Sequence, residues 1–205
     1  MHIIIFGDSI GQGFFDTEHN GWASHLSVYL QQKTLDSQFD IYYSVFNQSI
    51  SGENTTEIYE RLKNEITPRL SSSKKNVILF AGGINDAKRL QPSNDLYVPL
   101  EKTKQNVQKF IHDAKKLVDE VVFVGSVRVD EALTTNYVND SFENSDIEMY
   151  DQVVAESARE HGLVYVPLSD LIQHEHLADG LHPNAEGHRL IYERVKSELE
   201  KAGIL

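Results

Sequence analysis

The apolar run His2-Ile3-Ile4-Ile5-Phe6 leads directly into the turn Gly7-Asp8-Ser9-Ile10-Gly11. Uninterrupted large apolar residues are typical of a strand that is buried on both faces of a parallel sheet. A serine in the sharp turn after such a strand is held at the edge of the sheet, where its hydroxyl can reach a substrate. This stretch therefore predicts a parallel α/β fold and a candidate nucleophile, Ser9.

Four further apolar runs recur along the chain, at residues 39–46, 77–80, 121–124 and 163–166. The run at 39–46 alternates with polar residues and favours an edge strand, whereas the other three are nearly continuous. Helical patterns lie between the runs, with start signals at Asn54, Pro99 and Asn184 and a stop signal at Gly162. This alternation predicts an α/β fold: a three-layer α/β/α sandwich with a flavodoxin-like five-stranded parallel sheet, in one domain over residues 1–205.

Composition excludes several classes of protein. The chain has 19 basic and 31 acidic residues, a net charge of −12, so nucleic acid and anionic membrane surfaces are not expected partners. It has no cysteine, which excludes disulfides, thiolate catalysis and cysteine-ligated zinc. No apolar stretch approaches the roughly 20 residues of a membrane anchor, and the N-terminal run is too short for a signal-peptide core. We expect a cytoplasmic protein, unless a leader has been removed; the oligomeric state is not predicted.

Polar groups follow the strands at their carboxyl ends, where ligands bind in open α/β sheets. Ser9 follows the first strand, and Gly52 comes after the second, just before a helix start, where it offers a backbone N–H. Asn85 follows the third strand with a side-chain amide donor, and Asp179 and His182 follow the last. A nucleophile, two kinds of donor and an acid–base pair are the groups that acyl transfer needs.

Four blocks of sequence, in order, resemble those of the SGNH hydrolases, also called GDSL esterases and lipases. The blocks are Gly7-Asp8-Ser9-Ile10, Ser49-Ile50-Ser51-Gly52, Gly83-Ile84-Asn85-Asp86 and Asp179-Gly180-Leu181-His182. Two departures are small: Ile10 stands where leucine is usual, and Ile84 where threonine or glycine is common. Each block alone is a weak signal, but all four in order make chance an unconvincing explanation.

The resemblance implies a serine hydrolase that cleaves carboxylic esters and needs no metal or other cofactor. By this likeness Ser9, His182 and Asp179 form the catalytic triad, and an acyl-enzyme forms on Ser9. The oxyanion hole is implied to consist of the backbone N–H groups of Ser9 and Gly52 and the amide of Asn85.

Substrate contacts are expected from the two longest irregular segments, 82–98 and 127–142, which both follow strands. The candidate substrate-binding residues are Leu90, Tyr97, Arg128 and Tyr137. With an acidic chain and no anchor, a small soluble ester with a short acyl chain, such as an acetylated sugar, is our hypothesis for the substrate. A thioesterase or an acyltransferase on the same site remains an alternative, as does an inactive module that binds a carbohydrate or acyl group.

Three rival motifs fit less well. The G-x-S-x-G pattern around Ser9 also matches the nucleophile elbow of α/β-hydrolases, but several strands precede that elbow and only one precedes Ser9. Gly11 and Gly13 lack the third glycine of a dinucleotide-binding loop. His174 and His176, together with Asp179 and His182, have spacings that a divalent metal could use, although His174-Glu175-His176 is more typical of a solvated turn.

Overall fold

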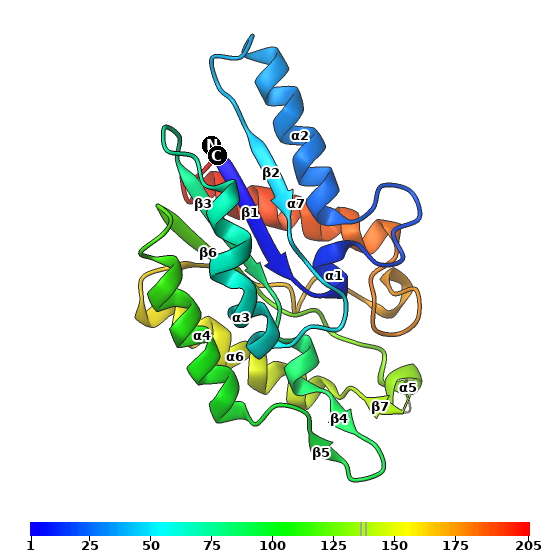
Figure 1. Cartoon of the computed structure of the whole chain (residues 1–205). Coiled ribbons are helices and arrows are strands. Elements are labelled where there is room, and N and C mark those ends of the chain that lie inside the picture. Colours follow the sequence, from blue (N-terminus) through cyan, green and yellow to red (C-terminus); the bar gives the residue numbers. More distant parts are fainter. Residues whose placement is uncertain (136, 138) are drawn as a thin grey trace.

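The computed structural model describes residues 1–135, 137 and 139–205, and a five-stranded parallel sheet forms its centre (Figure 1). The strands are β1 (His2–Gly7), β2 (Ser44–Asn47), β3 (Asn76–Ala81), β6 (Glu120–Val124) and β8 (Val164–Val166). Their order in space is β2-β1-β3-β6-β8, and all four pairings are parallel. This is the flavodoxin-like order, so the predicted fold class is confirmed.

Helices cover both faces of the sheet and complete the three layers. One face carries α2 (Trp22–Asp36) and α7 (Ala185–Lys201), and the other carries α3 (Thr55–Ile66), α4 (Leu100–Ala114) and α6 (Asn144–Glu160) (Figure 1). The side chains of β1 divide between the two layers. Ile3 and Ile5 pack with α2 and α7, whereas Ile4 and Phe6 pack with α3 and α4. Because both faces of β1 are buried, the strand has no polar position between Ile3 and Phe6.

The predicted helix signals lie where the helices begin and end. The Asn54 side chain caps α3 and forms a capping box with Glu57, and the Asn184 side chain accepts from the N–H of Gly187 at the start of α7. Gly162, with φ +66°, follows α6 and reverses the chain. These local signals determine where the chain returns to the next strand.

Two expectations about the connecting segments need correction. The strand expected over 39–46 is only Ser44–Asn47, because Gln38 and Phe39 take positive φ in the turn after α2. The segments 82–98 and 127–142 are joined by a small antiparallel sheet in the order β5-β4-β7. Its strands are β4 (Arg89–Leu90), β5 (Asp95–Leu96) and β7 (Asp140–Ser141).

Several short helices complete the described chain. They are α1 (Ser9–Gln12), α5 (Glu131–Thr134), η1 (Thr67–Arg69), η2 (Ile84–Ala87) and η3 (His174–His176). Of these, α1 begins at the candidate nucleophile, and η2 contains Asn85.

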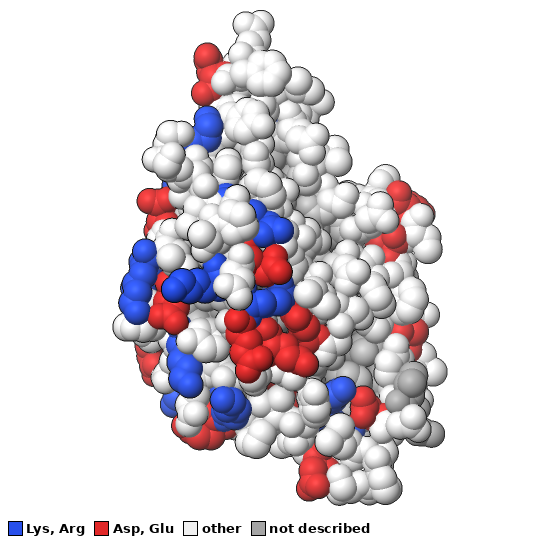
Figure 2. Space-filling view, in the orientation of Figure 1, with Lys and Arg blue, Asp and Glu red and all other residues white. Residues whose placement is uncertain are grey.

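Charged side chains gather over α3 and α4 on the face shown in Figure 2, where basic and acidic residues are interspersed. This face therefore presents a mixed charge rather than a basic groove, as expected for a chain of net charge −12. Within the described residues, none of the helices is both long enough and apolar enough to cross a bilayer.

Candidate active site

Ser9, His182 and Asp179 form a continuous hydrogen-bonded chain at the carboxyl end of the sheet. The distance from Ser9 Oγ to His182 Nε2 is 2.9 Å, and the distance from His182 Nδ1 to Asp179 Oδ2 is 2.8 Å. A carboxylate can only accept, so Nδ1 carries the proton and Nε2 is left to accept from the Ser9 hydroxyl. This is the tautomer that a general base requires.

Asp179 is held by four hydrogen bonds. Its Oδ1 accepts from the backbone N–H groups of Leu181 (3.0 Å) and His182 (2.7 Å), and its Oδ2 also accepts from the hydroxyl of Tyr137 (2.6 Å). Burial acts to raise the pKa of Asp179, but the hydrogen bonds, led by that from the His182 backbone, bring it below its ordinary value. The carboxylate is therefore ionised and fixed in the orientation that holds the imidazole.

The turn that presents Ser9 depends on Asp8 and two glycines. Asp8 caps α1 by accepting from the N–H of Ile10 at 3.0 Å, and burial raises the pKa of its carboxyl group to about 7. A Cβ on Gly7 would lie 2.5 Å from the carbonyl oxygen of Ala81. A Cβ on Gly11 would lie 2.5 Å from Oγ of Ser49. The missing side chains thus let the Ser9 turn pack directly against the neighbouring strand-end loops.

The two further donors expected for an oxyanion lie in those loops. Gly52 has φ +84°, and a Cβ built on it would meet no atom within 4 Å, so the backbone conformation rather than crowding requires glycine. Asn85 is 7% exposed, and its side-chain Nδ2 donates to the carbonyl oxygen of Glu53 at 3.0 Å. An amide nitrogen carries two hydrogens, so a second one remains for a substrate.

Asp86 ties these two loops together. Its carboxylate is fully buried and accepts from the backbone N–H (2.8 Å) and hydroxyl (2.6 Å) of Thr55, and from the hydroxyl of Thr103 (2.6 Å). Burial raises the pKa of Asp86, and these hydrogen bonds oppose that shift. Because Thr55 opens α3 just after Gly52, and Asp86 follows Asn85, the network sets the spacing between the two donors.

Sequence comparison agrees with this geometry. The family model described as "GDSL-like Lipase/Acylhydrolase family" matches residues 5–190. The chain belongs to this family. It is a carboxylic ester hydrolase of the GDSL type, as its four motifs predict.

The chain is also similar to individual proteins, at low sequence identity. A GDSL esterase/lipase of Arabidopsis thaliana is 27% identical over 219 residues, covering 98% of this chain and 86% of that protein. The structure of LAE5, an alpha/beta hydrolase enzyme from the metagenome of Lake Arreo, is 19% identical with a TM-score of 0.73, covering 100% of this chain and 95% of that one. Axe2, an acetylxylan esterase from Geobacillus stearothermophilus, is 17% identical with a TM-score of 0.73, covering 97% and 93%. At such identities the two structures establish the fold alone.

The four residues expected to contact substrate lie in different surroundings in this GDSL hydrolase. Tyr137 contacts the triad itself, through its hydrogen bond to Asp179. Leu90 pairs with Asp140 in the small sheet, and the ring of Tyr97 lies 4.3 Å from Nζ of Lys88. Arg128 borders surface depressions with Asn144, Asp170 and Leu177. The roles of all four residues as substrate contacts stay predictions.

The histidines near the triad are the candidate metal ligands that the sequence offers. Among the residues that the structure describes, there is no group of three or more His, Asp or Glu side chains placed to hold a metal ion. His174 and His176 lie in η3, where the Nδ1 of His176 accepts from the backbone N–H of Gln173. The imidazole of His182 is instead directed at Ser9.

Two side-chain contacts of the candidate site are not predicted by the sequence. The ring of Phe15 lies against His182 with a centroid distance of 5.1 Å and an interplanar angle of 84°. The hydroxyl of Tyr137, which is also a predicted substrate contact, donates to Asp179. The closeness of Phe15 to Ser9 in the sequence could have indicated the first contact, whereas no pattern in the sequence indicates the second.

Proposed function

We propose that this GDSL hydrolase is a serine esterase that forms an acyl-enzyme on Ser9 and acts on small esters with a short acyl chain, such as an acetylated sugar. The observation that carries the proposal is the chain of hydrogen bonds from Ser9 through His182 to Asp179, with distances of 2.9 and 2.8 Å. A serine hydroxyl is a weak nucleophile at neutral pH unless a base removes its proton, and His182 is in place to do so.

The reaction follows from the positions of the groups. Ser9 Oγ attacks the ester carbonyl while His182 Nε2 takes its proton, and Asp179 stabilises the imidazolium that forms. The tetrahedral intermediate breaks its bond to the leaving alcohol oxygen, which receives the proton from His182. Water then attacks the acyl-Ser9 ester with His182 again as base, which releases the acid and restores the serine.

The negative charge on the substrate oxygen needs donors that are already oriented. The backbone N–H groups of Ser9 and Gly52 and the free amide hydrogen of Asn85 are proposed for this role. Asn85 is suited to it because its bond to the carbonyl of Glu53 limits rotation of the amide. Donors fixed before the reaction cost no reorganisation when the charge develops.

The choice of a short acyl chain has two supports. A chain of net charge −12 is poorly suited to substrates embedded in anionic bilayers. The fold neighbour Axe2 is an acetylxylan esterase, which makes an acetylated carbohydrate a natural first substrate to assay.

The test is a chain-length series of 4-nitrophenyl esters, from acetate through butyrate to decanoate, followed by acetylated xylose oligomers. The proposal predicts the highest kcat/KM for acetate or butyrate, with no turnover by Ser9→Ala. A higher kcat/KM for decanoate would overturn the assignment of a short chain. Adding a competing alcohol and analysing the products would reveal an acyltransferase, since the acyl group would then appear on the alcohol in preference to water.

A further inference from the structure

Phe15 is an exposed aromatic residue beside the catalytic imidazole. Its ring is set edge to face against His182, at 5.1 Å between centroids, and the residue is 48% exposed. Phe14 lies on the same imidazole at 5.9 Å and is partly buried. Phe15 thus presents a large apolar surface to solvent at the entrance of the site.

The backbone of Phe15 takes a conformation that bulky residues rarely adopt. Its φ is +63°, in the left-handed region, where a side chain other than that of glycine costs about 1–2 kcal/mol. Such strain persists only where the surroundings hold the chain in place, and it concentrates at functional sites.

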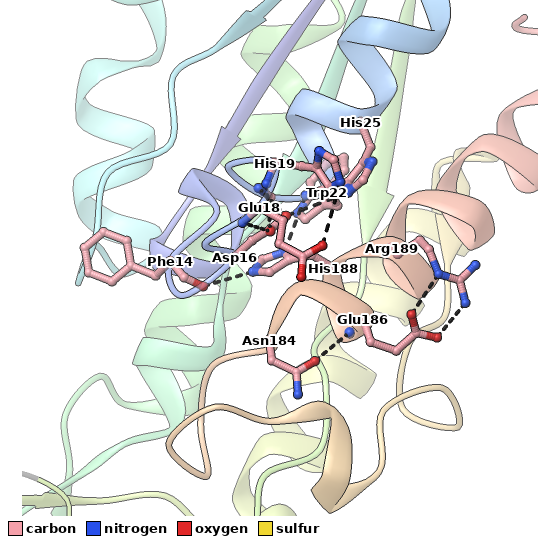
Figure 3. Close-up of polar contacts among 12 residues, drawn as sticks. Phe14, Asp16, Glu18, His19, Trp22, His25, Asn184, Glu186, His188 and Arg189 are labelled. Atoms are coloured by element: carbon pink, nitrogen blue, oxygen red, sulfur yellow. Dashed lines mark hydrogen bonds and ion pairs between the residues drawn. The ribbon is translucent and has the colours of Figure 1, made fainter.

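The loop that carries Phe15 is held from both ends (Figure 3). The carbonyl of Phe14 accepts from Nε2 of His188 at 3.0 Å. His188 is fully buried, and burial lowers the pKa of its imidazole, so the ring is neutral and its Nε2 carries the hydrogen. The backbone N–H of Trp22 donates to the other ring nitrogen, Nδ1, at 3.4 Å. One imidazole therefore joins the two ends of the loop.

Asp16 fixes the middle of the same loop. Its carboxylate accepts from the backbone N–H groups of Glu18 (3.0 Å), His19 (2.9 Å) and Gly21 (2.9 Å). At the base of the loop, a Cβ on Gly21 would lie 2.3 Å from the Cα of Gly13, so the two ends of the loop are in direct backbone contact. The ring of Phe15 is consequently placed before any substrate binds.

Phe15 lies nearer to the alcohol half of the ester than to its acyl half, an inference that rests on the proposed function. The carbonyl oxygen faces the donors Gly52 and Asn85, whereas the leaving oxygen must lie near Nε2 of His182 to receive its proton. Because Phe15 packs on that imidazole, it borders the space of the leaving alcohol.

We propose that Phe15 determines specificity for the alcohol half of the substrate and selects alcohols built on a six-membered ring. A flat or CH-rich ring, aromatic or pyranose, can lie against the phenyl face, whereas a short open-chain alcohol covers little of it. Because the loop is already ordered, the contact costs little conformational entropy, and it therefore strengthens the binding of substrate.

The experiment compares Phe15→Ala with Phe39→Ala, using ethyl acetate, phenyl acetate and a monoacetylated methyl xylopyranoside as substrates. Phe39 is a matched control because it is 64% exposed and has φ +71°, but it lies in the turn after α2. We expect Phe15→Ala to reduce the ratio of kcat/KM for a ring ester to that for ethyl acetate by on the order of tenfold, mainly through KM. Phe39→Ala leaves the ratio unchanged, and Phe15→Tyr, which keeps the ring, retains it.

Each outcome decides the proposal. A loss confined to phenyl acetate, or to the pyranoside, identifies which ring Phe15 selects. A ratio that is unchanged in Phe15→Ala, or changed equally in Phe39→Ala, overturns it while the esterase activity stands. If the wild type hydrolyses none of the three esters and does not react with a fluorophosphonate, the proposed function fails, and this inference fails with it. Should Phe15→Ala not fold, Phe15→Leu removes the flat ring while keeping an apolar side chain.

Discussion

Replacing Asn85 by alanine tests its proposed catalytic role in the oxyanion hole separately from its structural role. The substitution deletes an amide whose one hydrogen is bound to the carbonyl of Glu53 at 3.0 Å and whose other hydrogen is assigned to the substrate oxygen. Loss of a preset oxyanion donor lowers kcat by about 10²–10³, or about 3–4 kcal/mol of transition-state stabilisation. We expect that reduction in kcat for Asn85→Ala with little change in KM.

The same substitution has a smaller effect on stability. The lost bond to Glu53 is partly buried and joins neutral groups, so it contributes about 1 kcal/mol to the free energy of unfolding. In a chain of 205 residues this corresponds to a fall in Tm of roughly 2–4 °C. A protein that is still folded at 25 °C and has lost most of its turnover would thus separate the two roles of the amide.

The assay is steady-state hydrolysis of 4-nitrophenyl acetate beside urea unfolding. Asn64→Ala provides the control, because Asn64 is exposed on α3 and its loss should alter neither quantity. A kcat for Asn85→Ala within threefold of the wild type would refute the assignment of Asn85 to the oxyanion. A loss of activity that merely follows the unfolded fraction would refute it equally.

Three further substitutions test the groups behind the site. Tyr137→Phe removes the hydroxyl that donates to Asp179 at 2.6 Å. It should lower kcat/KM by about tenfold and move the acidic limb of the kcat/KM pH profile to higher pH. An unchanged profile and an unchanged kcat/KM would contradict this. Asp8→Asn should be increasingly stabilising relative to the wild type between pH 4 and pH 7 in urea unfolding, because the pKa of folded Asp8 is about 7 against 3.8 ordinarily. The unfolded chain then loses its proton first, so the stability of the wild type falls as pH rises through this window, by at most about 4 kcal/mol in all. A constant difference between the two proteins would speak against the raised pKa. Thr103→Val removes one of three donors to Asp86, and urea unfolding should show a loss of about 1.5–3 kcal/mol together with reduced kcat; unchanged stability would show that the network does not hold the loops.

Much of the fold could be predicted from the sequence because local patterns and global topology agree in this chain. The continuous apolar run from Ile3 to Phe6 reflects burial on both faces of β1, and the capping box at Asn54 marks the start of α3. The prediction of a strand over 39–46 was wrong for its first half. The alternating pattern begins in a turn where Gln38 and Phe39 have positive φ angles, and hydrophobic periodicity does not indicate such angles. The strands of the small sheet contain two residues each, too few to show a period.

The site residues were predictable for a different reason. Parallel strands bring their carboxyl ends to one edge, so Ser9 and His182 could be expected together although they are far apart in the chain. What could not be predicted was side-chain direction within long loops. Tyr137 follows a segment that contacts the loop of Asp179, where the N–H of Asp130 donates to the carbonyl of Gly180, and its hydroxyl donates to Asp179. Phe15 reaches His182 because His188 and Asp16 hold the loop that carries it.

The central claim is that Ser9 is an activated nucleophile, and intact-mass analysis after incubation with a fluorophosphonate tests it most directly. The probe reacts with an activated serine whatever the natural substrate. The hydrogen bond of 2.9 Å from Ser9 to His182 predicts one adduct on the wild type and none on Ser9→Ala. An adduct that persists on Ser9→Ala, or no adduct on folded wild-type protein, would contradict the account.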